Sequence, residues 1–210
     1  TIIFAIVILI FSVIIHELAH GYAAYSLGDS TARYAGRLTL NPIKHIDPFG
    51  SIILPGLLII SSLFSGGPGI IFGWAKPVPV NHYNFRDQKW GQLKVAVAGP
   101  LSNIALALFF GAVLRALPAA IFANMPGLPL MFSLIVQVNI ILAVFNLLPI
   151  PPLDGSWVLF KFLPPQFEAA KIFLQQYGFF ILIFLLFFGG LRWLIFAQEW
   201  LFKLFTGIVI

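Results

Sequence analysis

Residues 2–20 read IIFAIVILIFSVIIHELAH, an uncharged run that ends in a polar motif. The apolar character continues to about Leu27, and Gly28-Asp29 is a turn signal, so we predict one helix over residues 2–27. At about 1.5 Å per residue, the stretch before His16 covers roughly 21 Å of a hydrocarbon layer about 30 Å thick. This length places the polar motif inside the membrane or near its far boundary.

The composition indicates that the bilayer is the solvent for most of the chain. Hydrophobic residues make up 60% of the sequence and charged residues 9%, whereas a soluble domain carries roughly 25% charged residues. The net charge of +5 comes from bases scattered singly between apolar runs, as in loops that flank membrane spans. A basic stripe interleaved with aromatic residues is absent from the sequence, which argues against nucleic acid as a partner.

Further apolar runs predict an all-α polytopic membrane protein with about six membrane helices or partial spans. After the first helix, we expect them at residues 49–64, 92–117, 128–148, 167–188 and 191–207. The run at 49–64 is short and contains Pro55, so it predicts either a kinked span or a re-entrant segment. The run at 191–207 carries charges and predicts a helix that lies in the membrane interface.

Two segments between the first helices are predicted to be extended. Residues 37–40 (RLTL) alternate in polarity, which predicts a short strand or β-hairpin element after the first helix, and residues 74–80 also read as extended. The expected organisation is a single domain over residues 1–210. It comprises the HExxH helix (1–27), the helices up to the Asp-Gly segment (92–155) and the C-terminal membrane helices (156–210). Because Thr1 already stands in an apolar run, we expect further residues upstream.

Residues 16–20 form the motif His-Glu-Leu-Ala-His, which predicts a metal site. Positions i and i+4 share one face of a helix, so His16 and His20 can reach one ion. The intervening Glu17 can then act as a general base toward water. Satisfied polar residues in a helix bundle are the alternative, but ionisable groups within a membrane are costly and mark function by default.

A catalytic zinc ion requires three protein ligands, and the sequence contains no cysteine to supply one. Asp154 is the best candidate for the third ligand, because it follows a long apolar helix and the proline-broken run 149–152, and Gly155 permits a tight turn after it. Asp47 is the second candidate, although its Asp-Pro setting is more typical of a solvated turn. The remaining histidines, His45 and His82, lie in polar connections.

Four stretches carry a resemblance to a known family: HELAHGYAAYSLGDSTARYAGRLTLNP (16–42), GWAKPVPVN (73–81), AGPLSN (98–103) and NLLPIPPLDG (146–155). Their order and their hydrophobic setting resemble the site-2 protease family of intramembrane zinc metalloproteases. The resemblance implies that one Zn²⁺ per chain is bound by His16, His20 and Asp154, and that Glu17 is the catalytic glutamate. It also implies that Asn146 contacts substrate or the oxyanion. The chain resembles a minimal form of the family without PDZ or CBS domains.

The function that this resemblance implies is hydrolysis of peptide bonds within transmembrane segments of membrane-protein substrates, in a prokaryotic cell membrane. A membrane metal-ion transporter is the alternative, since transporters also place His and acidic residues at the bilayer midplane. Two pseudo-symmetric halves would favour a transporter, and the sequence has none. A di-iron oxygenase would need more than the four histidines present.

Overall fold

The computed structural model describes residues 2–54, 56–57, 60, 73–118, 120, 124–125 and 127–208. The longer helices are α1 (Ile2–Ser26), α4 (Gly91–Ala116), α6 (Gly127–Asn146), α7 (Gly155–Phe162), α8 (Glu168–Phe187) and α9 (Trp193–Thr206). Short helical segments are α2 (Thr31–Tyr34), η1 (Pro42–His45), the π-helix η2 (Pro48–Ile53), η3 (His82–Asn84) and η4 (Pro165–Phe167). The described residues contain no β-strand.

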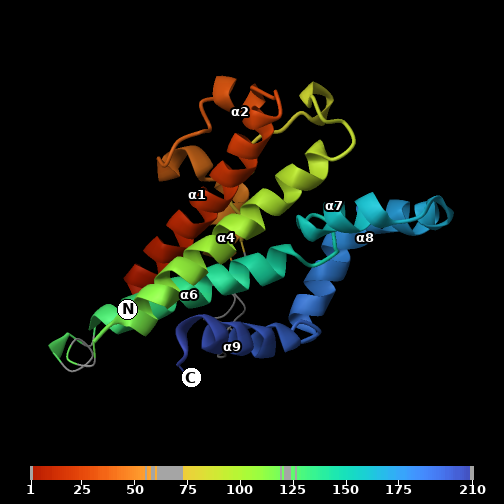
Figure 1. The fold of residues 1–210 in the computed structure, drawn as a ribbon. Coiled ribbons are helices and arrows are strands. Elements are labelled where there is room, and N and C mark those ends of the chain that lie inside the picture. Colours follow the sequence, from red (N-terminus) through yellow and green to blue (C-terminus); the bar gives the residue numbers. More distant parts are fainter. Residues whose placement is uncertain are drawn as a thin grey trace.

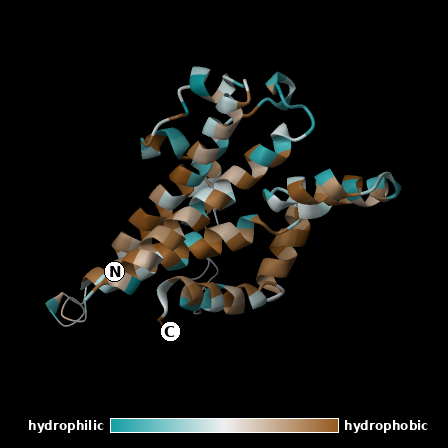
Figure 2. Ribbon diagram, in the orientation of Figure 1, coloured by the Kyte–Doolittle hydropathy of each residue, from teal (hydrophilic) through white to brown (hydrophobic). Residues whose placement is uncertain are grey.

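The centre of the fold is a bundle of α1, α4 and α6, which lie side by side in Figure 1. Helix α9 packs against α4 and α6 and contributes Phe202 to a buried cluster with Leu114 of α4 and Ile140 of α6. Figure 2 shows that these helices are largely hydrophobic along their length, whereas α2 and the connection before α4 are more hydrophilic. The bundle therefore has an apolar body with a polar end.

Helix α8 packs beside the proline-rich turn that joins α6 to α7. Leu182 of α8 contacts the buried Leu148 and Leu153 of that turn. The approach is close because residue 178 is glycine: a Cβ there would lie 2.6 Å from the carbonyl oxygen of Pro151. Outside these contacts α8 exposes a series of phenylalanines, including Phe180 and Phe184, which suits a surface that faces lipid. The turn is thus held between the bundle and α8.

Within the part of the chain that the structure describes, four helices are long and apolar enough to cross a membrane: Ile3–Ser26, Gly91–Ala116, Gly127–Asn146 and Pro165–Phe187. The predicted count of about six membrane helices or partial spans is therefore not confirmed by these residues. Helix α9 has 14 residues and spans about 21 Å, less than a hydrocarbon layer of about 30 Å, so an interfacial position stays a prediction. The predicted span 49–64 begins with η2, and much of its remainder lies outside the described residues. The single-domain organisation also stays a prediction.

The predicted strand or β-hairpin at residues 37–40 is wrong. These residues form a bend without a ladder, because their polar groups bind elsewhere. The guanidinium of Arg37 is buried and donates to the carbonyl oxygens of Lys76 (2.7 Å) and Pro77 (3.4 Å). The carbonyl of Thr39 contacts the ring of His45. A strand requires a neighbouring strand, and alternating polarity alone does not supply one.

Residues 73–81 cross α1 as an irregular segment whose amides bind the rest of the protein at alternate positions. The N–H groups of Trp74, Lys76 and Val78 donate to the carbonyl oxygen of Gly50 (3.1 Å), the carbonyl oxygen of His45 (2.9 Å) and Glu17 Oε2 (2.7 Å). Such bonding is required where irregular backbone lies at membrane depth, because lipid satisfies no polar group.

Asp29 fastens the far end of that segment to the end of α1. Its carboxylate is fully buried and accepts hydrogen bonds from the backbone N–H and hydroxyl of Thr31, the N–H of Asn81 and the amide of Asn84. Burial raises the pKa of Asp29, but these hydrogen bonds outweigh burial and hold the pKa below its ordinary value. The carboxylate therefore joins the turn after α1 to the connection before α4.

Asp29→Ala should lower the stability of the fold, because four donor groups on three neighbouring residues would lose a charged acceptor. We expect the free energy of unfolding to fall by about 2 kcal/mol or more, measured by circular dichroism on the protein in detergent. A variant within about 0.5 kcal/mol of the wild type would contradict this assignment.

The same carboxylate gives the expected pH dependence. Since the pKa of Asp29 is lower in the folded state, its contribution is fully present above the unfolded value of about 3.9. The contribution is lost as the pH falls from there through the folded value. The difference in stability between the wild type and Asp29→Ala should shrink over this interval.

Candidate metal centre

His16 and His20 lie one turn apart on α1 and both point away from lipid into the bundle. They are 5% and 8% exposed, and their rings meet edge to face with centroids 4.7 Å apart. The HExxH spacing produces this arrangement because residues i and i+4 share a helix face. Thus one helix supplies two imidazoles to one point in the bundle.

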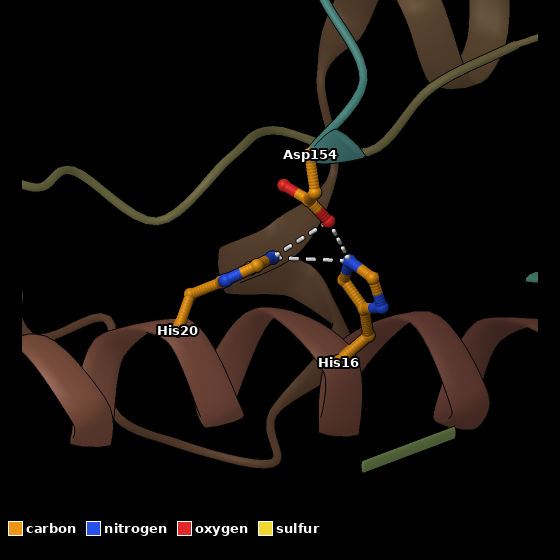
Figure 3. A group of neighbouring side chains, drawn as sticks. All are labelled: His16, His20 and Asp154. Atoms are coloured by element: carbon orange, nitrogen blue, oxygen red, sulfur yellow. Dashed lines mark hydrogen bonds and ion pairs between the residues drawn. The ribbon is translucent and has the colours of Figure 1, made fainter. Parts of the chain in front are cut away.

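Asp154 reaches the same point from the turn between α6 and α7, as Figure 3 shows. Its Oδ2 lies 3.0 Å from His16 Nε2 and 3.2 Å from His20 Nε2, and the two Nε2 atoms are 3.1 Å apart. Gly155 makes the turn possible, since a Cβ there would lie 2.5 Å from the carbonyl oxygen of Leu148. Among the described residues, these three side chains are the group that could hold a metal ion.

The hydrogen bonds behind the two rings determine which ring atoms face Asp154. His20 Nδ1 lies 2.7 Å from the carbonyl oxygen of Val95, which can only accept, so Nδ1 carries the hydrogen. His16 Nδ1 lies 2.6 Å from Asn103 Oδ1, also an acceptor. In the neutral rings both Nε2 atoms therefore present lone pairs toward the carboxylate.

Three lone pairs that converge in this way require a cation or a proton between them. The spacing also suits zinc: two ligand atoms at about 2.0–2.1 Å from a tetrahedral ion lie about 3.3 Å apart. The observed separations of 3.0–3.2 Å are close to this value. His16, His20 and Asp154 therefore fit a zinc ion in both donor chemistry and geometry.

Gly99 on α4 leaves the space in which these groups meet. A Cβ on residue 99 would lie 2.6 Å from His16 Nε2 and closer still to His20 Nε2. Helix α4 can approach the two rings only because this position has no side chain.

Glu17 stands beside His16 on α1 and faces the 73–81 segment. Its Oε2 accepts the Val78 N–H at 2.7 Å, and the side chain is half-buried. The backbone of the segment therefore fixes one carboxylate oxygen.

The other predicted candidates are not members of this group of three, and the hydrogen bonds described for them have other partners. Asn146 ends α6 and donates to the carbonyl oxygen of Leu142, one turn earlier on the same helix, at 2.9 Å. Asp47 caps the start of η2 by accepting the Gly50 N–H, as expected for a turn residue. His45 binds the Thr39 carbonyl, and His82 is exposed in η3.

Asn103 and Asn139 are the site residues that the sequence interpretation missed. Both are fully buried; Asn103 contacts His16, and Asn139 contacts Asn103. Asn103 belongs to the AGPLSN stretch, but its position in that stretch does not predict a hydrogen bond to His16. The available signal was a polar side chain within a long apolar run, which is costly in a membrane.

Fold and site together define a polytopic membrane protein in which His16, His20 and Asp154 form a group that could hold a metal ion. A family model described as peptidase family M50 matches residues 118–185. A protein of Bacillus subtilis strain 168 named YwhC, provisionally a zinc metalloprotease, is 42% identical over 187 residues, which cover 87% of this chain and 79% of YwhC. No solved structure matches the chain significantly.

Two mycobacterial relatives named Rip2, also provisionally zinc metalloproteases, extend the comparison. The Rip2 of Mycolicibacterium smegmatis is 34% identical over 94% of this chain and 71% of its own length. The Rip2 of Mycobacterium tuberculosis H37Rv is 32% identical over 87% of this chain and 69% of its own length. The chain belongs to peptidase family M50, the site-2 protease family. Its membrane helices and bacterial relatives agree with a place in a prokaryotic cell membrane.

Gly99→Ala is expected to abolish stoichiometric metal binding, because its Cβ would displace both imidazoles. The measurement is zinc per chain in the purified, folded protein. Gly127→Ala is the matched control, since a Cβ at residue 127 of α6 meets nothing within 4 Å. If Gly99→Ala binds one zinc ion with the affinity of the wild type, the assigned site is wrong.

Proposed function

We propose that this protein is a zinc-dependent endopeptidase that cuts membrane-protein substrates within their transmembrane segments. The observation that supports this most directly is the convergence of His16, His20 and Asp154 inside an apolar bundle. We assign these three residues as the metal ligands. The relatives YwhC and Rip2 carry zinc metalloprotease in their names, which agrees with zinc as the ion.

Zinc, when bound, acts as a Lewis acid that lowers the pKa of water and polarises a carbonyl group. The chain must then supply a base, and Glu17 is our assignment. The Val78 N–H holds Oε2 at 2.7 Å, which leaves Oε1 to accept a proton from water. After attack on the scissile carbonyl, Glu17 would pass that proton to the leaving amine. The bond to Val78 would keep the carboxylate oriented during both transfers.

Asn146 is our candidate for stabilising the oxyanion. It stands at the end of α6, eight residues before Asp154 along the proline-rich turn. Its amide donates to its own helix at Leu142, so a role in catalysis requires the side chain to rotate toward the substrate. Substrate binding would then exchange one hydrogen-bond partner for another.

A helical substrate must unwind before its carbonyl groups can be attacked. Addition of an extended substrate to a strand edge is one mode of recognition, and the segment at residues 74–80, which we predicted to be extended, is a candidate for such an edge. The contacts of this segment argue against that use. Its amides at residues 74, 76 and 78 bind the protein, and the intervening Pro77 and Pro79 carry no N–H. The segment is better suited to orienting Glu17 than to pairing with substrate.

The metal-ion transporter has no specific observation in its favour. Family membership supports a peptidase, and a transporter has no need of Glu17 between the two histidines.

Glu17→Gln tests the mechanism. Loss of the base should lower kcat by about 10²–10⁴-fold while zinc content stays at one per chain. Cleavage is followed with a purified single-span substrate in detergent or vesicles. Glu199→Gln on α9 makes the same chemical change at an exposed position and should leave cleavage unchanged. Full activity of Glu17→Gln would show that Glu17 is not the base.

Asn146→Leu tests the oxyanion assignment. We expect kcat to fall by about 10²–10³-fold with little change in KM, since the amide would act only in the transition state. Gln137→Leu, on the same helix, is the control. A variant that raises KM alone would instead place Asn146 in substrate binding.

A further inference from the structure

A cluster of polar side chains is buried behind His16, on the side away from Asp154. Ser12 and His16 come from α1, Asn103 from α4 and Asn139 from α6. Each is at most 5% exposed, and both asparagines are fully buried. Polar groups of this kind are costly within a membrane bundle, so their arrangement requires an explanation.

The hydrogen bonds of this cluster fix the orientation of each amide in turn, beginning at a backbone carbonyl. The carbonyl oxygen of Ile135 can only accept, so the group of Asn139 that lies 2.9 Å from it is Nδ2. Asn139 Oδ1 must then face Asn103, whose donor Nδ2 lies 2.8 Å away. The same Nδ2 lies 3.3 Å from the carbonyl oxygen of Ser12, a second acceptor.

This orientation leaves Asn103 Oδ1 directed at His16 Nδ1, 2.6 Å away. An amide oxygen can only accept, so Nδ1 must carry the hydrogen and Nε2 keeps its lone pair. A second bond, from Asn139 Nδ2 to Ser12 Oγ at 3.0 Å, ties Asn139 to the helix that carries His16. The cluster therefore connects a fixed backbone group on α6 to the tautomer of one imidazole on α1.

We propose that Asn103 and Asn139 are positioning residues that hold His16 in the Nδ1–H tautomer and so direct Nε2 toward the metal. Asn103 acts on His16 directly, and Asn139 acts through Asn103. His20 needs no such side chains, because the Val95 carbonyl oxygen accepts the hydrogen of its Nδ1. This inference rests on the metal site proposed above, but it assigns roles to residues outside the ligand set.

A purely structural role is the competing explanation, in which the asparagines only join three helices. The two roles differ in what a substitution changes. Loss of a helix contact lowers the stability of the bundle, whereas loss of the hydrogen-bond partner of a ligand lowers metal affinity, by about 10–100-fold in other sites. Zinc affinity of the folded protein, measured by competition with a chelator, separates the two.

Asn103→Leu and Asn103→Asp form the decisive pair of variants. Leucine has a similar size but accepts nothing, which frees His16 to adopt the other tautomer, so zinc affinity should fall about 10–100-fold. Aspartate keeps an acceptor for His16 Nδ1, so affinity should stay within a few-fold of the wild type. Cobalt substitution provides a second readout, because its visible absorption reports the tetrahedral geometry.

Thr206→Val is the matched control, since it removes a buried hydroxyl on α9 that binds its own helix at Phe202. It should leave zinc affinity unchanged. If the Asn103→Leu variant folds and binds zinc as tightly as the wild type, the inference is overturned. If Asn103→Leu does not fold, Asn139→Leu takes its place: a roughly tenfold lower affinity supports the inference, and an unchanged affinity overturns it.

The outcome for the wild type separates this inference from the proposed function. If the wild type binds no zinc, the metal site itself is wrong. If the wild type binds one zinc ion and both leucine variants bind it equally well, the proposed function stands and only the positioning role fails.

Discussion

Two imidazole nitrogens and one carboxylate oxygen face one another at 3.0–3.2 Å inside a bundle of apolar helices. Unshared lone pairs repel at that distance, and lipid offers no group to satisfy them, so the arrangement depends on a cation. The constraint organises the fold: α1 must present one face to the turn after α6, and α4 must approach with Gly99 because any Cβ would occupy the same space. Helix α8 holds the turn between α6 and α7 in place through the close contact at Gly178.

The main helices and the convergence of His16, His20 and Asp154 were predictable, because they follow largely from local rules. A helix over 2–27 was expected, and α1 spans Ile2–Ser26. The helices predicted at 92–117 and 128–148 correspond to α4 (Gly91–Ala116) and α6 (Gly127–Asn146). Uninterrupted apolar character determines such elements, and the i, i+4 spacing brings His16 and His20 together whatever the rest of the chain does. Asp154 was identified because its proline-rich setting had to end a helix at that point.

The features that the sequence did not predict depend on contacts between distant elements. Alternating polarity at residues 37–40 suggested a strand, but the buried guanidinium of Arg37 binds the carbonyl oxygens at residues 76 and 77 instead. The partners of Asn103 and Asn139 depend on how α1, α4 and α6 are rotated about their axes, which no single helix determines. Likewise, only the folded chain brings the Val78 N–H to Glu17. Each of these contacts satisfies a polar group that the membrane would leave unpaired.

The central claim is that one zinc ion is bound jointly by α1 and by the turn before α7. Zinc K-edge X-ray absorption on the purified, folded protein, combined with metal analysis, tests this most directly. The account predicts one zinc ion per chain with only nitrogen and oxygen neighbours at about 2.0–2.1 Å, two of them imidazoles, and loss of one oxygen neighbour in Asp154→Ala. A protein without stoichiometric zinc, or a zinc environment that is unchanged in Asp154→Ala, would contradict it.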